Sequence, residues 1–229
     1  MNIVICTIKS WNIRMAEVFK LSAEGKHNTK IITEKKDLTY STLEEFDPQY
    51  IFFPHWSSII PKEIFEKWNC IVFHMTDLPF GRGGSPLQNL ISRDIKDTKI
   101  SAIKVNDTID GGPVYIKENL NLSGTAEEIY MRASEIIFGK MIPYILDVHP
   151  EPVEQAGEIV TFKRRSPDQS ELSSNMDLKQ IYNYIRMLDG EGYPNAFINF
   201  GKYKLKFSRA SFKGDRIIAD VEIVEDDNE

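Results

Sequence analysis

The chain has 229 residues, of which 41% are hydrophobic and 27% charged, and its formal net charge is −6 at pH 7. This composition excludes a disordered chain and is typical of one globular domain, with or without a small appendage, around a sizeable core. The negative net charge also argues against nucleic acid as the main partner, because proteins that neutralise phosphates usually present a basic face.

The sequence gives little support for metal, disulfide or membrane chemistry. The two cysteines, Cys6 and Cys70, lie inside apolar runs, which indicates buried thiols. No two of the four histidines have the spacing of a zinc site. The N-terminus lacks the features of an export signal, and no stretch approaches the roughly 20 apolar residues of a membrane span. We therefore expect a cytoplasmic protein that needs no metal and contacts no membrane.

The first part of the chain alternates short apolar runs with helical patterns. Strands are predicted over four runs rich in β-branched or aromatic residues, at residues 2–7, 29–33, 49–54 and 70–75. Helices are predicted over residues 15–21, after a capping box of Ser41 and Glu44, and near Pro61.

Two further strands, at residues 99–105 and 113–120, flank a tight turn. The longest helix is predicted over residues 125–148, where the sequence TAEE forms a capping box at its start. Alternating strands and helices over residues 1–150 predict a Rossmann-like α/β domain with a mostly parallel sheet. In such sheets ligands bind beyond the carboxyl ends of the strands.

The pattern changes after two prolines that end this helix. Residues 163–175 are polar, residues 177–189 read as a helix, and residues 195–225 contain short alternating strands with turns. We therefore predict a small α+β appendage over residues 151–229.

The most informative segment is FHMTDLPFGRGGSPLQNLI, residues 73–91. A strand ends at His74 and leads into a loop rich in glycine and proline, and a new helix begins near Ser85. The glycines permit close approach of the backbone, and the free N–H groups at the start of the helix could receive an anionic or oxyanionic ligand. A purely structural connection would leave His74 and Arg82 unexplained.

Two other positions are candidates for a site. His55 also follows a strand, in the loop FFPHWSSIIP, although it could simply pack beside Trp56. Asp110 lies in the turn between two strands, within NDTIDGGPVY. An Asp-Gly turn alone is a common hairpin connection, so the weight of Asp110 depends on a partnership with His74.

The segment from His74 to Pro86 resembles the folate-dependent formyltransferases. In that family a strand ending in His is followed by a loop of the form S-L-L-P-x-x-R-G-x-x-P, and this chain matches the loop in length without a gap. The family's catalytic Asp lies in a D-x-G turn, and Asp110 follows His74 by 36 residues, the separation that the family has. Residues 161–207 are similar to the segment after the catalytic domain of methionyl-tRNA and sugar formyltransferases, through R-x-P, I-R-x-L and Y-P-x-A-F elements.

The resemblance implies an enzyme that moves a formyl group from N10-formyltetrahydrofolate, its cosubstrate, to a primary amine. Residues 1–150 would be the catalytic domain, in which His74 donates to the developing oxyanion and carries protons while Asp110 orients it. Two loops would hold the pterin through His55, Trp56, Ser57, Ile59, Val105, Asn106 and Ile109. Contacts to the acceptor are expected from Arg82, Gly83, Gly84, Ser85, Arg164 and Tyr193.

This chain departs from the family pattern at one position. The family carries a catalytic Asn two residues before the His, but that position is Val72 here. Residues 72 and 74 of a strand point to the same face, so a hydrophobic side chain faces the site where an amide is expected. Asn89, Asn106 or a backbone N–H could replace the missing donor, or this branch manages without it.

The resemblance leaves several acceptors open. The chain ends before the larger C-terminal barrel of the tRNA enzyme, and this end, together with the acidic charge, favours a nucleotide-linked aminosugar of lipopolysaccharide or O-antigen biosynthesis. The alternatives are a methionyl-tRNA formyltransferase-like enzyme acting on another amine and an inactive protein that only binds folate. A dinucleotide-binding oxidoreductase is disfavoured because no G-x-G-x-x-G turn follows the first strand. The strand-rich appendage could pair two copies of the chain.

Overall fold

The computed structural model describes residues 1–225 and divides the chain into two compact units. The first unit comprises Met1–Gly83, Thr98–Leu120 and Met131–Thr161, and the second comprises Gly84–Asp97, Asn121–Tyr130 and the chain from Phe162 onward. The assignment of residues 1–150 to a catalytic domain and of residues 151–229 to an appendage remains a prediction.

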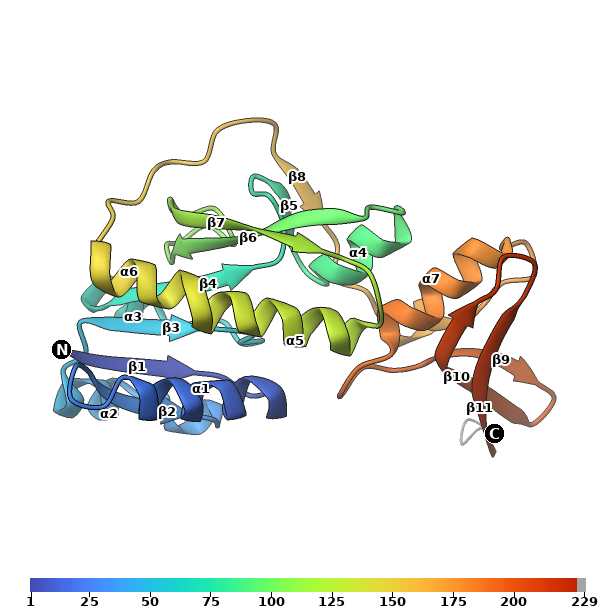
Figure 1. Cartoon of the computed structure of the whole chain (residues 1–229), viewed down its shortest axis with the longest axis horizontal. Coiled ribbons are helices and arrows are strands. Elements are labelled where there is room, and N and C mark those ends of the chain that lie inside the picture. The colour runs from blue at the N-terminus through green and yellow to red at the C-terminus, as the bar shows by residue number, and fades with distance from the viewer. Residues whose placement is uncertain (226–229) are drawn as a thin grey trace. The chain divides into compact units, whose positions relative to one another are not determined.

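A six-stranded sheet organises the first unit (Figure 1). Its strands in chain order are β1 (Asn2–Cys6), β2 (Asn28–Ile32), β3 (Tyr50–Phe53), β4 (Asn69–His74), β6 (Asp97–Lys104) and β7 (Val114–Asn121). They lie side by side in the order β2-β1-β3-β4-β6-β7. The pairings β1–β2, β1–β3 and β3–β4 are parallel, whereas β4 and β6 are antiparallel. The predicted Rossmann-like fold with a mostly parallel sheet is therefore confirmed.

Side chains on both faces of this sheet are buried, as expected for strands that helices cover on either side. The helices that follow the first three strands are α1 (Ser10–Ser22), a short 3-10 turn η1 (Lys35–Asp37), α2 (Tyr40–Phe46) and α3 (Lys62–Lys67). On one face, alternate strand residues pack with Leu43 of α2 and Ile64 of α3; these strand residues are Val4, Cys6, Ile51, Phe53 and Cys70. The intervening residues are fully buried as well; they include Ile3, Ile5, Phe52 and Ile71.

The start of α2 differs from the expectation. Thr39 caps the helix, and its hydroxyl accepts a hydrogen bond from the Thr42 N–H at 3.1 Å. The predicted capping box of Ser41 and Glu44 is therefore wrong by two residues. The pattern S/T-x-x-E was present, but a threonine two positions earlier satisfies the free N–H groups at the helix start.

The long helix predicted over residues 125–148 forms as three consecutive segments, namely α5 (Ala126–Ile136), a π-helical turn η2 (Ile137–Met141) and α6 (Ile142–Val148). Its capping box is confirmed, since the Thr125 N–H donates to Glu128 Oε2 at 2.8 Å and the Glu128 N–H to Thr125 Oγ1 at 3.3 Å. The π turn ends two residues before Pro143, which has no N–H to continue an α-helical ladder.

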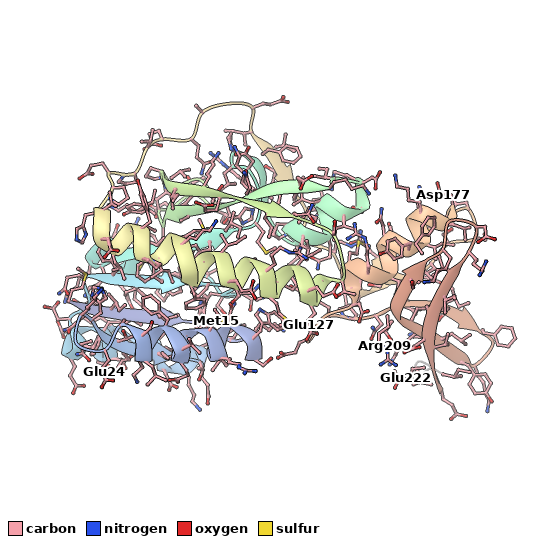
Figure 2. The ribbon with its side chains drawn as sticks, viewed as in Figure 1. Met15, Glu24, Glu127, Asp177, Arg209 and Glu222 are labelled. Atoms are coloured by element: carbon pink, nitrogen blue, oxygen red, sulfur yellow. The ribbon has the colours of Figure 1, made fainter. Side chains whose placement is uncertain are left out.

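The second unit combines helices with an antiparallel sheet. Its elements are α4 (Pro86–Ser92), a 3-10 turn η3 (Pro167–Ser170), α7 (Leu178–Leu188), β9 (Ala196–Phe200), β10 (Tyr203–Phe212) and β11 (Ile217–Glu225). The strand order is β11-β10-β9. Asp177, labelled in Figure 2, caps α7 by accepting from the Gln180 N–H at 2.8 Å. Two short strands, β5 (Phe80–Gly83) and β8 (Val160–Phe162), form a separate pair.

Over residues 1–225, we find no helix with the length and hydrophobicity that crossing a membrane would require.

Candidate active site

His74 is the last residue of β4 and is only 8% exposed. Its Nε2 lies 2.8 Å from the carbonyl oxygen of Gly81. A carbonyl oxygen can only accept a hydrogen bond, so Nε2 carries a proton and donates a hydrogen bond to the Gly81 carbonyl. The nitrogen left for chemistry in this arrangement is Nδ1.

Asp110 meets that nitrogen from the turn after β6. Its Oδ2 lies 3.5 Å from His74 Nδ1 and accepts a hydrogen bond from the Gly83 N–H at 2.9 Å. The backbone of Asp110 is in the left-handed region, with φ 51°. The two residues chosen from the sequence are therefore in contact, although their catalytic role remains a prediction.

The contact between His74 and Asp110 constrains where protons can be. With Nε2 protonated, a neutral imidazole would turn the lone pair of Nδ1 toward a carboxylate oxygen, and the two would repel. A proton on Nδ1 converts the repulsion into an ion pair, although 3.5 Å is longer than an ordinary N–H···O hydrogen bond. The pair is thus arranged to hold one proton beside the loop, as general acid–base chemistry requires.

Gln155 was not identified from the sequence, yet it connects the two loops of the site. Its side-chain Nε2 donates to the carbonyl oxygens of Asp110 and Gly112, each at 2.8 Å. Its Oε1 accepts from Arg82 Nε at 3.1 Å and from an Arg82 terminal nitrogen at 2.8 Å. Arg82, expected to contact the acceptor, therefore supports the Asp110 turn through Gln155.

A second group of charges holds the chain between His74 and Gly81. Lys117 donates to Asp77 Oδ1 at 2.6 Å and also to the Leu78 carbonyl, and Lys99 lies 3.0 Å from Asp77 Oδ2. Burial alone would raise the pKa of Asp77, but the hydrogen bonds from Lys117 and Lys99 outweigh it and lower that pKa below its ordinary value. The Leu78–Pro79 peptide bond is cis.

The two loops expected to hold the pterin converge on one hydrophobic cluster. Trp56 from the loop after β3 and Val105 from the loop after β6 both pack against the cluster beneath α2 and α3. Lys62 at the start of α3 forms an ion pair of 3.0 Å with Asp107. The two segments are thus fixed side by side.

Two apolar side chains of these loops remain outside the core. Ile59 is 89% exposed and Ile109 is 72% exposed. Ser57 is exposed as well, and Asn106 uses its Oδ1 to accept from the Thr108 N–H at 3.0 Å. Trp56 Nε1 is buried and has no hydrogen-bond partner. Exposed apolar surface on these two loops fits a flat, largely apolar ligand that would cover it.

His55 is held at the end of β3 by its neighbours. Its φ of 54° lies in the left-handed region, and its ring meets Trp11 edge-to-face at 5.7 Å between centroids. The preceding Pro54 carbonyl accepts from Thr7 Oγ1 at 2.9 Å and from Asn12 Nδ2 at 3.4 Å. His55 thus packs against Trp11, and its role in folate binding remains a prediction.

Asn89 and Asn106 differ in how free they are to replace the family's Asn. Asn89 Nδ2 donates to three main-chain carbonyls at 3.0–3.1 Å, and its Oδ1 accepts from Arg93, so its amide is fully used. Asn106 is exposed, and its Oδ1 is engaged with Thr108. Val72 packs against the hydrophobic cluster and adds no donor.

The other expected acceptor contacts belong to the second unit, apart from Gly83 at the end of the first. The Gly84 N–H donates to the Phe162 carbonyl at 3.2 Å, and Ser85 Oγ accepts from the Arg165 N–H at 3.1 Å. Arg164 is exposed.

Tyr193 stacks on Tyr130 at 5.5 Å and accepts from its hydroxyl at 2.7 Å. Burial raises the pKa of Tyr193. Tyr193 is thus part of an internal pair, and its contact with the acceptor remains a prediction.

Within residues 1–225, no group of three His, Cys, Asp or Glu side chains is arranged to hold a metal ion.

Known proteins share both the fold and the C-terminal segment. A family profile described as methionyl-tRNA formyltransferase, C-terminal domain, matches residues 167–224. The solved structure of a methionyl-tRNA formyltransferase from Clostridium thermocellum is 63% identical, covers 99% of this chain and 100% of its own, and has a TM-score of 0.98. A methionyl-tRNA formyltransferase of Mycoplasma capricolum is 26% identical over 201 residues, covering 84% of this chain but only 63% of the relative. This chain belongs to the formyltransferase family.

The comparisons correct the expected acceptor. A sugar N-formyltransferase from Shewanella matches with a TM-score of 0.72 and covers 91% of this chain and 97% of its own, but it is only 14% identical and so supports the fold alone. The more similar proteins are named methionyl-tRNA formyltransferase. The assignment to a nucleotide-linked aminosugar and to lipopolysaccharide or O-antigen biosynthesis is therefore wrong. The same names conflict with the expectation that no nucleic acid takes part.

Proposed function

We propose that this chain transfers a formyl group from N10-formyltetrahydrofolate to the amine of methionyl-tRNA. The observation that carries the proposal is the contact between His74 and Asp110 at 3.5 Å beside the loop that resembles the formyltransferase motif. The acceptor is inferred from the relative that is 63% identical over its whole length and is named methionyl-tRNA formyltransferase. The match of residues 167–224 to the C-terminal domain of that enzyme supports the same acceptor.

The residues present fit a formylated folate as the donor. Ile59 and Ile109 offer exposed apolar surface on two adjacent loops. The pterin and its aromatic extension would lie against these loops, which the ion pair of Lys62 and Asp107 ties together.

In the reaction the amine nitrogen bonds to the formyl carbon, the bond from that carbon to N10 breaks, and the proton lost by the amine is returned to N10. With Nε2 used on the Gly81 carbonyl and Nδ1 facing Asp110, His74 would stabilise the negative charge that develops on the formyl oxygen through the positive charge of its protonated ring. Its Nδ1 would carry the proton, because an imidazole exchanges protons near neutral pH. Asp110 would keep the His74 ring in one orientation and balance its positive charge. The Gly83 N–H, which donates to Asp110, would hold that carboxylate in place.

Mass spectrometry of methionine released from the tRNA tests the proposal. The protein is incubated with N10-formyltetrahydrofolate and methionyl-tRNA, and a gain of one formyl group on methionine is expected. Free methionine and uncharged tRNA serve as controls for the acceptor. If wild-type protein leaves methionyl-tRNA unformylated, the proposed acceptor is wrong.

A matched pair of histidine variants tests the site. We expect His74→Gln to lower the rate by about 10²–10⁴-fold, the usual contribution of a general acid–base. The control is His149→Asn, which alters an exposed histidine at φ 50° whose ring Nδ1 lies 3.1 Å from the Tyr50 hydroxyl. Asparagine tolerates this left-handed backbone, so the control should keep the wild-type rate. Equal rates in the two variants would remove His74 from the mechanism.

Val72 favours a second candidate, a protein that binds formylated folate without transferring the group. The side chain adds no hydrogen bond where the family pattern has an amide. Val72→Asn distinguishes the two: an inactive wild type that gains transfer with this substitution would support the binding function. An active wild type would exclude it.

A further inference from the structure

The turn that carries Asp110 has few main-chain hydrogen bonds of its own. Residues 106–109 are exposed. The local bonds run from the Thr108 N–H to Asn106 Oδ1 and from the Gly111 N–H to the Thr108 carbonyl, each at 3.0 Å. Neither involves Asp110, so its position must be set from outside the turn.

Gln155 supplies that support with all the hydrogen-bonding capacity of its side chain. Its two amide hydrogens go to the carbonyls of Asp110 and Gly112, and its oxygen receives two hydrogen bonds from Arg82. The orientation of the amide follows from the partners, because carbonyls only accept and a guanidinium only donates. A flipped amide would lose all four hydrogen bonds.

The segment that carries Gln155 is itself fixed at both sides. It runs without helix or strand between α6 and β8 (Figure 1). Val153 exchanges two main-chain hydrogen bonds with Val114, at 2.7 and 2.9 Å, and the Val160 N–H donates to the Pro79 carbonyl at 3.3 Å. Gln155 is therefore presented to the Asp110 turn from two anchored points.

We propose that Gln155 is a positioning residue of the active site, which holds the Asp110 carboxylate against His74 by bridging Arg82 to the Asp110 turn. This inference rests on the proposed formyl transfer, although one of its tests does not require that activity. The four hydrogen bonds at residue 155 require an amide side chain. A glutamate would keep the bonds from Arg82 but turn an oxygen toward two carbonyls, and a leucine would make none of the four bonds.

Kinetics of Gln155→Leu and Gln155→Glu provide the first test. We expect kcat to fall about 10- to 100-fold in both variants, because a misplacement of about 1 Å at a reacting group can cost 10² in rate. KM should change by less than about threefold, because the Gln155 amide is fully used on Arg82, Asp110 and Gly112 and has no hydrogen-bonding group left for a substrate. The control Glu154→Gln alters the exposed neighbouring side chain and should behave as wild type. Similar kcat values for Gln155→Leu and Glu154→Gln would overturn the inference.

A double-mutant cycle with Asp110→Asn separates positioning from a general loss of stability. If Gln155 acts through Asp110, adding Gln155→Leu to Asp110→Asn should lower the residual rate by less than about twofold, because both changes remove the same interaction. Multiplicative losses would mean that Gln155 acts elsewhere. Wild-type protein without transfer activity would instead contradict the proposed function and not this inference.

The environment of His74 gives a measurement that needs no turnover. In protein labelled with 15N-histidine, the Nδ1 resonance of His74 should move in Gln155→Leu in the same direction as in Asp110→Asn. It should stay in place in Glu154→Gln. An unmoved resonance in Gln155→Leu would show that Asp110 keeps its position without Gln155, and the inference would fail.

Discussion

The substitution Gly112→Ala tests how tightly the Asp110 turn is built. A Cβ at residue 112 would lie 1.7 Å from the carbonyl oxygen of Lys104 and 2.9 Å from its carbonyl carbon. Non-bonded contacts of Cβ atoms are essentially never shorter than 3.0 Å, so one backbone must move by at least about 1.3 Å. Lys104 resists this movement because it ends a central strand and its N–H donates to Pro113 at 2.9 Å.

The movement would reach the site by two routes. Gly112 lies two residues from Asp110, and its carbonyl shares the Gln155 amide with the Asp110 carbonyl. Since about 1 Å of misplacement can cost 10² in rate, kcat should fall about 100-fold. Forcing an extra carbon into a packed site costs about 1–3 kcal/mol, which for a chain of this size lowers Tm by about 2–4 °C per kcal/mol.

Gly139→Ala is the matched control. A Cβ there would meet nothing within 4 Å, and alanine is favoured over glycine in a helix by roughly 0.5–1 kcal/mol. Tm should stay constant or rise slightly, and the transfer rate should not change. Formyl transfer at saturating substrates and thermal unfolding followed by circular dichroism measure both effects. If Gly112→Ala keeps kcat within about twofold of Gly139→Ala, the turn does not fix Asp110 as described.

Three other substitutions or conditions have defined outcomes. Ile109→Asp should raise KM for the formylated folate about tenfold, equivalent to about 1.4 kcal/mol. Val18→Asp is the control, because it makes an equally polar change at an exposed residue of α1, and it should leave KM unchanged. Equal KM values in the two variants would remove Ile109 from the folate site. Hydrogen bonds, foremost from Lys179, lower the pKa of Asp94 from its ordinary value of 3.8, so this carboxylate stabilises the fold above pH 3.8 and its contribution is lost as the pH falls through the lower folded value. The Tm difference between wild type and Asp94→Asn should accordingly be present at pH 6 and shrink below pH 3.8, and a constant difference would contradict the assignment. Burial raises the pKa of Cys70 to about 12, so a thiol reagent at pH 8 should label neither of the two cysteines until the protein is unfolded, and rapid labelling of native protein would contradict their burial.

The sheet was predictable because burial on both faces leaves a direct record in the sequence. Residues 2–7, 49–54 and 70–75 are nearly continuous apolar runs, and they coincide with three parallel strands, of which β4 begins one residue earlier, at Asn69. The contact of His74 with Asp110 came from the resemblance to the formyltransferases and not from periodicity. The same resemblance could not reveal Gln155, because a glutamine in a polar segment has no distinguishing pattern.

Other side chains were harder to interpret because their partners are distant in the chain. Asn89 looked like a free amide, but its donors and acceptor are used on three main-chain carbonyls and Arg93. Tyr193 was expected to contact the acceptor, and nothing in the sequence indicated its hydrogen bond with Tyr130, which lies 63 residues away in the chain. The acceptor was mistaken for another reason, since net charge averages over the whole molecule and does not report what one surface binds.

The groups that orient the reacting side chains are mostly atoms of the backbone. His74 donates to the carbonyl of Gly81, Asp110 accepts from the N–H of Gly83, and Gln155 donates to the carbonyls of Asp110 and Gly112. Every residue type offers the same carbonyl, and every residue except proline the same N–H. Chains that follow the same path can therefore rebuild these contacts with different side chains along the loop, provided that the space near Gly112 stays open. Comparison of loop geometry should find such sites where comparison of residue identities fails.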